Sequence, residues 1–134
     1  MLSIFPSLFA FEFFAPLILR AVVGAIFVYF GYTKIYKDKV SKISSFESVG
    51  MKPAKMFFWA SALLEIVGGL FLILGLYTQV AAAVLSIIII GAIYMKIRKP
   101  AALSSGFDFL ILILAVLVSL LFLGGGIWAI DLPL

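Results

Sequence analysis

The chain alternates long apolar runs with short polar connections, a pattern typical of membrane-spanning helices. About 20 mostly apolar residues suffice for a helix to cross a hydrocarbon core of roughly 30 Å. Four runs meet this requirement, over about residues 16–36, 55–76, 78–97 and 107–123. Their apolar residues are continuous rather than alternating, which argues against strands of a membrane β-barrel. The pattern predicts an all-α integral membrane protein, an antiparallel bundle of four transmembrane helices that forms a single domain over residues 1–134.

The segments between and before these runs add detail to this architecture. Residues 1–15 are apolar and aromatic without Lys or Arg, so they lack the basic region of a secretory signal and predict an interfacial helix or an extension of the first span. Pro16 suits a helix start, and Ser104-Ser105-Gly106 offers a cap for the fourth span. Residues 76–78 leave room only for a tight turn, which predicts a helical hairpin of the second and third spans.

Apart from Arg20, the basic residues gather around two of the connections. They are Lys34, Lys37, Lys39, Lys42, Lys52 and Lys55 around the first connection and Lys96, Arg98 and Lys99 around the third. Loops rich in Lys and Arg face the cytoplasm, so both basic connections are expected there and both termini outside.

Composition supports the membrane and narrows the chemistry. The chain is 66% hydrophobic and 12% charged, whereas soluble domains carry about 25% charged residues. The net charge of +4 is explained by topology, and we expect no nucleic-acid partner. The absence of Cys and His excludes disulfides, thiolate metal sites and the commonest haem and zinc ligand. We predict no metal site and no covalently bound cofactor.

Each span carries a stripe of small or polar residues at helical spacing, as expected where membrane helices pack closely. The four stripes are Arg20, Gly24, Phe27, Gly31 and Lys34; Ser61, Ala62, Glu65, Gly68, Gly69 and Leu72; Thr78, Ala82 and Ser86; and Asp108, Leu112, Ala115, Ser119 and Phe122. These stripes predict a compact bundle rather than four independent anchors.

Two charges stand out by their depth within the spans: Glu65 lies near the middle of its span, and Arg20 lies about one turn inside the outer end of its own. They form the candidate polar centre. A charge at the bilayer centre costs roughly 2.5–3.5 kcal/mol on insertion scales, so such residues turn inward and find partners. The two backbones differ in depth by about 10 Å, which a direct pair could nearly span. The alternative is structural: Arg20 snorkels to the outer surface, and Glu65 is protonated or hydrogen-bonded.

Three sequence motifs resemble signatures of the DoxX family. They are Arg20-x-x-x-Gly24-x-x-Phe27-x-x-x-Gly31-x-x-Lys34, Glu65-x-x-Gly68-Gly69-x-x-Leu72-x-x-Gly75-x-x-Thr78, and the tail Gly124-Gly125-Gly126-Ile127-Trp128-Ala129-Ile130-Asp131. The chain departs from the family at Gly125, where many members have proline, and at Asp108, where glutamate is common. The resemblance covers most of the chain and implies a small four-span protein of a bacterial or archaeal plasma membrane.

The resemblance also implies a function, because some members of this family are subunits of quinone-linked redox assemblies or are linked to oxidative-stress defence. The chain would then be a quinone-interacting subunit of a membrane oxidoreductase complex, without a complete active site of its own. The candidate quinone or lipid pocket is lined by Arg20, Gly24, Gly31, Glu65, Gly68 and Gly69. In this hypothesis Arg20 donates hydrogen bonds to a quinone carbonyl, Glu65 relays a proton, and the glycines leave room for the head group.

Other functions stay open at this point. Besides the lipid bilayer, the expected partner is a peripheral or soluble redox protein that supplies electrons, and self-association into a homo-oligomer is an open alternative. A second hypothesis is a non-catalytic membrane scaffold, assembly factor or small-lipid-binding protein, in which the polar centre only fixes helix register. A transporter is least favoured, because the spans show neither broken helices nor an inverted repeat.

Overall fold

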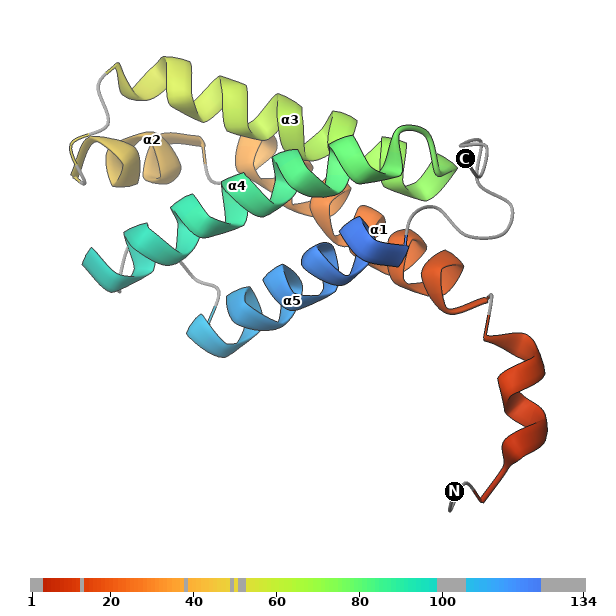
Figure 1. Ribbon diagram of the computed structural model, residues 1–134. Helices are drawn as coiled ribbons and strands as arrows, with labels where there is room; N and C mark the ends of the chain where they lie inside the picture. The colour runs from red at the N-terminus through yellow and green to blue at the C-terminus, as the bar shows by residue number, and fades with distance from the viewer. Residues whose placement is uncertain are drawn as a thin grey trace.

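The computed structural model describes residues 4–12, 14–37, 39–48, 50, 53–98 and 106–123. Within these ranges the chain forms five α-helices and one 3-10 helix and no strand (Figure 1). The elements are η1 (Pro6–Phe11), α1 (Phe14–Tyr36), α2 (Lys39–Ser48), α3 (Ala54–Leu74), α4 (Thr78–Arg98) and α5 (Phe107–Leu123). The prediction of an all-α membrane protein is confirmed. Ser104, Ser105 and the Gly124–Asp131 tail motif lie outside the described residues.

Three of the helices, α1, α3 and α4, are long and apolar enough to cross a membrane, with 21 to 23 residues each. The fourth, α5, is apolar but shorter, with 17 residues. Seventeen residues lie at the lower end of the length range of transmembrane helices. The four predicted spans therefore correspond to three full-length helices and one short one.

The connection between α3 and α4 is the predicted tight turn. Gly75 adopts a left-handed conformation (φ 72°, ψ 31°), its N–H donates to the Leu72 carbonyl, and the Leu76 N–H donates to the Phe71 carbonyl. This Schellman arrangement ends α3, and glycine tolerates the positive φ that it requires. Tyr77 also has a positive φ, of 48°, immediately before α4 begins at Thr78. The helices consequently return antiparallel to one another.

The antiparallel order brings the basic residues together at one end of the bundle. The amide of Gln79, at the start of α4, donates to the carbonyl of Leu121, near the end of α5, at 2.8 Å, so these two helices are also antiparallel. The end of α1, the start of α3 and the end of α4 consequently lie on the same side. We call this side, which carries Lys34, Lys37, Lys55, Lys96 and Arg98, the basic end.

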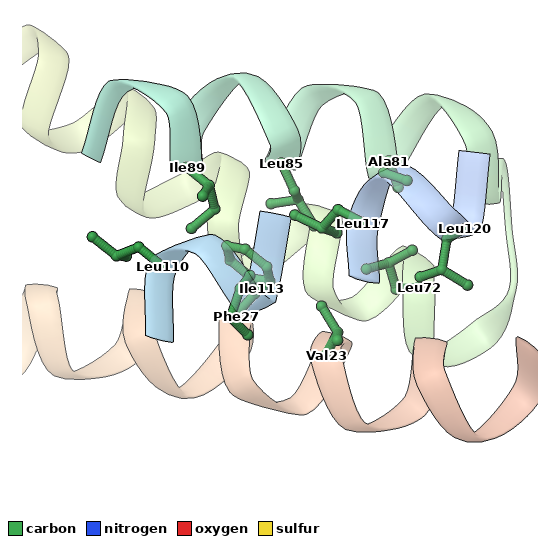
Figure 2. Close-up of a cluster of buried hydrophobic side chains, with 11 residues drawn as sticks. Val23, Phe27, Leu72, Ala81, Leu85, Ile89, Leu110, Ile113, Leu117 and Leu120 are labelled. Atoms are coloured by element: carbon green, nitrogen blue, oxygen red, sulfur yellow. The ribbon is translucent and has the colours of Figure 1, made fainter. Parts of the chain in front are cut away.

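A cluster of apolar side chains from α1, α3, α4 and α5 fills much of the bundle's core. Figure 2 shows its side chains converging from these helices, with Phe27, Leu72, Leu85, Leu117 and Leu120 fully buried among them. The outer surface is apolar as well: Phe122, Ile87 and Ile18 are 86%, 69% and 59% exposed. Apolar residues on both sides of a helix are expected where lipid is the solvent, and packing rather than hydrophobicity then distinguishes inside from outside.

The predicted stripe of the fourth span is wrong. Asp108, Leu112, Ala115, Ser119 and Phe122 lie on the exposed face of α5, and the buried residues are Leu110, Ile113, Leu117 and Leu120. The Ser119 hydroxyl donates to the Ala115 carbonyl within the same helix, so it requires no partner from a neighbouring helix. Large aliphatic side chains fill the core from this side instead.

Two short elements lie outside the four-helix core. The 3-10 helix η1 projects away from the bundle at the start of α1, as an element separate from that helix (Figure 1). At the basic end, α2 occupies the first connection, for which the sequence analysis made no prediction of secondary structure. Ile43 of α2 packs against a small second cluster of Ala54, Phe58 and Met95.

Candidate functional site

The interface between α1 and α3 is held together by glycines. A Cβ built on Gly24 would lie 2.5 Å from the carbonyl oxygen of Gly69, and one built on Gly69 would lie 2.6 Å from that of Gly24. A Cβ on Gly31 would approach the Ala62 carbonyl oxygen to 2.9 Å. Small residues allow the backbones of membrane helices to come into direct contact, as α1 and α3 do here.

Gly68 performs the same role against the next helix. Its missing side chain is replaced by Leu85 of α4, whose Cδ2 atom would lie 3.1 Å from an added Cβ. The spaces beside Gly24, Gly31, Gly68 and Gly69, which the sequence predicted to leave room for a ligand, are thus filled by neighbouring atoms. The chemistry of the interface lies in its polar side chains.

A largely buried ion pair joins α1 to α3. The Lys34 ammonium lies 2.8 Å from Glu65 Oε1 and also donates to the Ser61 hydroxyl at 3.3 Å. The Ser61 hydroxyl in turn donates to the Phe58 carbonyl at 3.0 Å. Only 13% of the lysine side chain and 7% of the glutamate side chain are exposed. We call Lys34, Ser61 and Glu65 the polar cluster.

The antiparallel arrangement of the helices explains why these side chains meet. The Cα–Cβ bonds of a helix lean toward its N-terminus. Lys34, in the last turn of α1, therefore leans from the basic end into the bundle, and Glu65 leans along α3 toward the basic end. A lysine near a helix end would ordinarily extend toward water. Here it reaches inward to the carboxylate.

The second oxygen of the carboxylate has no such partner. Glu65 Oε2 is buried and accepts no hydrogen bond from any residue that the structure describes. Buried polar atoms without a partner are rare in folded proteins and are costly when charged. The polar cluster therefore presents one unsatisfied hydrogen-bond acceptor inside the bundle.

Arg20 occupies the other end of the same interface. It is 1% exposed, and its Nη1 donates to the carbonyls of Ile73 at 2.8 Å and Leu72 at 3.3 Å. These are carbonyls of the last turn of α3, where a cation is favoured by the helix dipole. Snorkelling of Arg20 to the surface is thus wrong. Leu72 and Glu65 lie about 10 Å apart along α3, so Arg20 and Glu65 have separate partners at different depths.

Sequence reasoning placed Lys34 and Ser61 on the inner stripes but did not include them among the candidate site residues. The signal was present, because Lys34 follows Gly31 by three residues and Ser61 precedes Glu65 by four, which is one helical turn in each case. The charge of Lys34 had been interpreted only as an orientation signal.

Comparison with known proteins identifies the fold family. The family model for DoxX matches residues 15–98, more than half of the chain. The chain belongs to the DoxX family. The match extends from α1 to the end of α4 and includes the whole polar cluster together with Arg20.

Two relatives of this DoxX protein are informative. A Bacillus subtilis protein with the provisional name oxidoreductase CatD is 30% identical over 105 residues, which cover 78% of this chain and 76% of that protein. An uncharacterized membrane protein of Mycobacterium tuberculosis, Rv3486, is 33% identical over 129 residues, covering 84% and 77% of the two chains. No solved structure matches this chain.

Proposed function

We propose that this DoxX protein is a quinone-interacting subunit associated with a membrane oxidoreductase complex or with oxidative-stress defence. We place it in the plasma membrane of a bacterium or archaeon, with its basic end in the cytoplasm, because Lys and Arg favour that side. The observation that carries the proposal is the polar cluster, in which the buried carboxylate of Glu65 keeps one oxygen unpaired. The relative named an oxidoreductase supports the direction of the proposal.

One feature of the interface supports a site for a quinone and its hydroquinone, the unpaired oxygen Oε2 of Glu65. A quinone supplies two-electron chemistry in which protons accompany the electrons. Glu65 is the group that would hold or pass a proton at Oε2, while Lys34 fixes the other carboxylate oxygen and balances its charge. Ser61 orients the ammonium. Such ionisable groups inside a bundle commonly mark proton relays.

The remaining candidate residues hold the helices around the polar cluster in place. Arg20 holds the end of α3, and Gly24, Gly31, Gly68 and Gly69 hold α3 against α1 and α4. Because the chain contains no His or Cys, the proposal assigns electron supply to a peripheral or soluble redox protein. The quinone would then meet the polar cluster within the bilayer.

The proposal is tested by purifying the protein in mild detergent from its own membranes, with any co-purifying proteins, and measuring bound quinone by mass spectrometry. We expect quinone to be retained. The paired variant Lys34→Met with Glu65→Leu removes both buried charges, which spares the fold the cost of leaving one alone, and it should lose the quinone. Glu47→Gln, an exposed glutamate on α2, is the matched control. Failure of the wild type to retain or bind any quinone, with or without its neighbours, overturns the proposal.

A non-catalytic scaffold or lipid-binding role is the second candidate. The contact of Gly24 with Gly69 and the binding of Arg20 to helix carbonyls favour it, because both fix the register of α1 on α3. The variants Arg20→Gln and Glu65→Gln, combined, distinguish the two candidates. A folded double variant with an unchanged redox phenotype would assign the polar residues to structure alone, because a carboxamide can still hydrogen-bond a quinone but cannot relay a proton.

A further inference from the structure

The carboxylate of Glu65 is satisfied on one side only. Oε1 accepts a hydrogen bond from the Lys34 ammonium at 2.8 Å, whereas Oε2, although buried, accepts none from the described residues. The side chain is 93% buried, since 7% of it is exposed. Bulk water therefore does not reach this oxygen from the surface. A hydrogen-bond donor for Oε2 would have to lie inside the bundle.

The donors of the polar cluster are engaged elsewhere. The ammonium of Lys34 is directed to Oε1 and to the Ser61 oxygen, and the hydroxyl of Ser61 is directed to the Phe58 carbonyl. What the cluster lacks is a donor, because its one unpaired atom is an acceptor. A ligand that binds at this point must bring an O–H or N–H group.

We infer that the polar cluster selects the reduced form of its ligand, a lipid-soluble hydroquinone, over the oxidised quinone. This inference rests on the proposed function. A hydroquinone hydroxyl donates to Glu65 Oε2 and forms a charge-assisted O–H···O⁻ bond, a strong class of hydrogen bond. A quinone carbonyl has only lone pairs, which would face those of the carboxylate. Glu65 is thereby the residue that distinguishes the two redox forms.

The size of the preference follows from the value of one such bond. A hydrogen bond to a charged group contributes enough to change a dissociation constant by about tenfold or more. We expect the hydroquinone to bind at least about tenfold more tightly than the quinone with the same ring and tail.

The test uses the full chain in lipid nanodiscs without oxygen. A short-chain benzoquinone and its hydroquinone are titrated separately, and their dissociation constants are measured by equilibrium dialysis. Glu65→Gln is the decisive variant, because a carboxamide offers N–H donors as well as an acceptor oxygen and therefore also serves a quinone carbonyl. We expect the preference to fall to about equal affinity. Glu47→Gln, the same change at an exposed position, should keep the wild-type preference.

Glu65→Gln leaves the charge of Lys34 without its carboxylate, so its folding is checked by gel filtration. The paired variant Lys34→Gln with Glu65→Gln removes this difficulty and carries the same expected loss of preference. A wild-type preference for the hydroquinone that disappears in the folded Glu65→Gln protein supports the inference.

The remaining outcomes separate the inference from the proposed function. Equal affinities in the wild type, or tighter binding of the quinone, overturn the inference and leave the quinone-binding function standing. A preference that persists in the folded Glu65→Gln protein overturns it too, because another residue then supplies the contact. Absence of binding by either form overturns the proposed function and the inference together.

Discussion

The interface of α1 with α3 contains two cations in very different settings, Arg20, which is buried, and Lys34, which is partly buried. Arg20 meets the carbonyls of Leu72 and Ile73, neutral dipoles at a helix end. Lys34 meets the carboxylate of Glu65, a full charge, and leaves one of its oxygens unpaired. The first setting stabilises a helix terminus, whereas the second leaves a charged acceptor unsatisfied. The difference separates a satisfied structural contact at one end of this interface from an unsatisfied acceptor at the other.

The strongest way to break this comparison is to separate the two helices. Gly24→Leu places a side chain where the Gly69 carbonyl oxygen now lies, 2.5 Å from the position of a Cβ, so backbone must move. We expect most of the folded protein to be lost, as judged by gel filtration in detergent. The contact of Arg20 with the end of α3 and the Lys34–Glu65 pair should be disrupted together. Gly91→Leu is the matched control, because an added Cβ there meets nothing within 4 Å. A well-folded Gly24→Leu protein would contradict the close contact.

The next effect is expected from removing one charge of the buried pair. Glu65→Leu leaves Lys34 without its carboxylate, and breaking such a pair typically costs about 3–5 kcal/mol of unfolding free energy. Lys34→Met with Glu65→Leu should recover most of this loss, because replacing both charges by apolar groups is often close to neutral. Denaturant titration in mixed micelles measures both variants. Equal destabilisation by the single and the paired change would show that the two side chains do not act as a pair.

Arg20→Met tests the structural setting and should have a smaller effect. The substitution removes charged hydrogen bonds that contribute about 1.5–3 kcal/mol each to the last carbonyls of α3. The Leu72 carbonyl keeps a second donor, the Gly75 N–H, so part of the helix end remains satisfied. We expect a loss of about 2 kcal/mol in the same denaturant assay and no change in hydroquinone preference. A changed preference would place Arg20 in the ligand site and remove the contrast between the two settings.

The inner faces of α1 and α3 were predictable from sequence because glycines and charges interrupt otherwise aliphatic helices. Residues from Arg20 to Gly31 and from Ala62 to Leu72 are buried where the spacing predicted. The face of α5 was predicted wrongly, since lipid and core are both apolar and Ser119 bonds to its own helix. The α2 helix was missed because its polar sequence resembles a loop.

The choice of partners could not be predicted from spacing alone. Periodicity places Arg20, Lys34 and Glu65 on facing stripes, but it does not give the relative depth of two helices. That depth is set where Gly24 meets Gly69, and this contact brings Lys34 opposite Glu65 and Arg20 opposite the end of α3. A one-turn shift of α1 would change both pairings.

The smallest effect is expected from a change inside the polar cluster, at Ser61. Ser61→Ala removes the second acceptor of the Lys34 ammonium and should cost about 1 kcal/mol of unfolding free energy. The Lys34–Glu65 pair itself stays intact, so the hydroquinone should remain the preferred ligand. Ser119→Ala on the exposed face of α5 is the control, because that hydroxyl bonds only within its own helix. If Ser61→Ala abolished the preference while leaving stability unchanged, the ligand would contact Ser61 rather than the free oxygen of Glu65, and the assignment of the acceptor would have to move by one turn of α3.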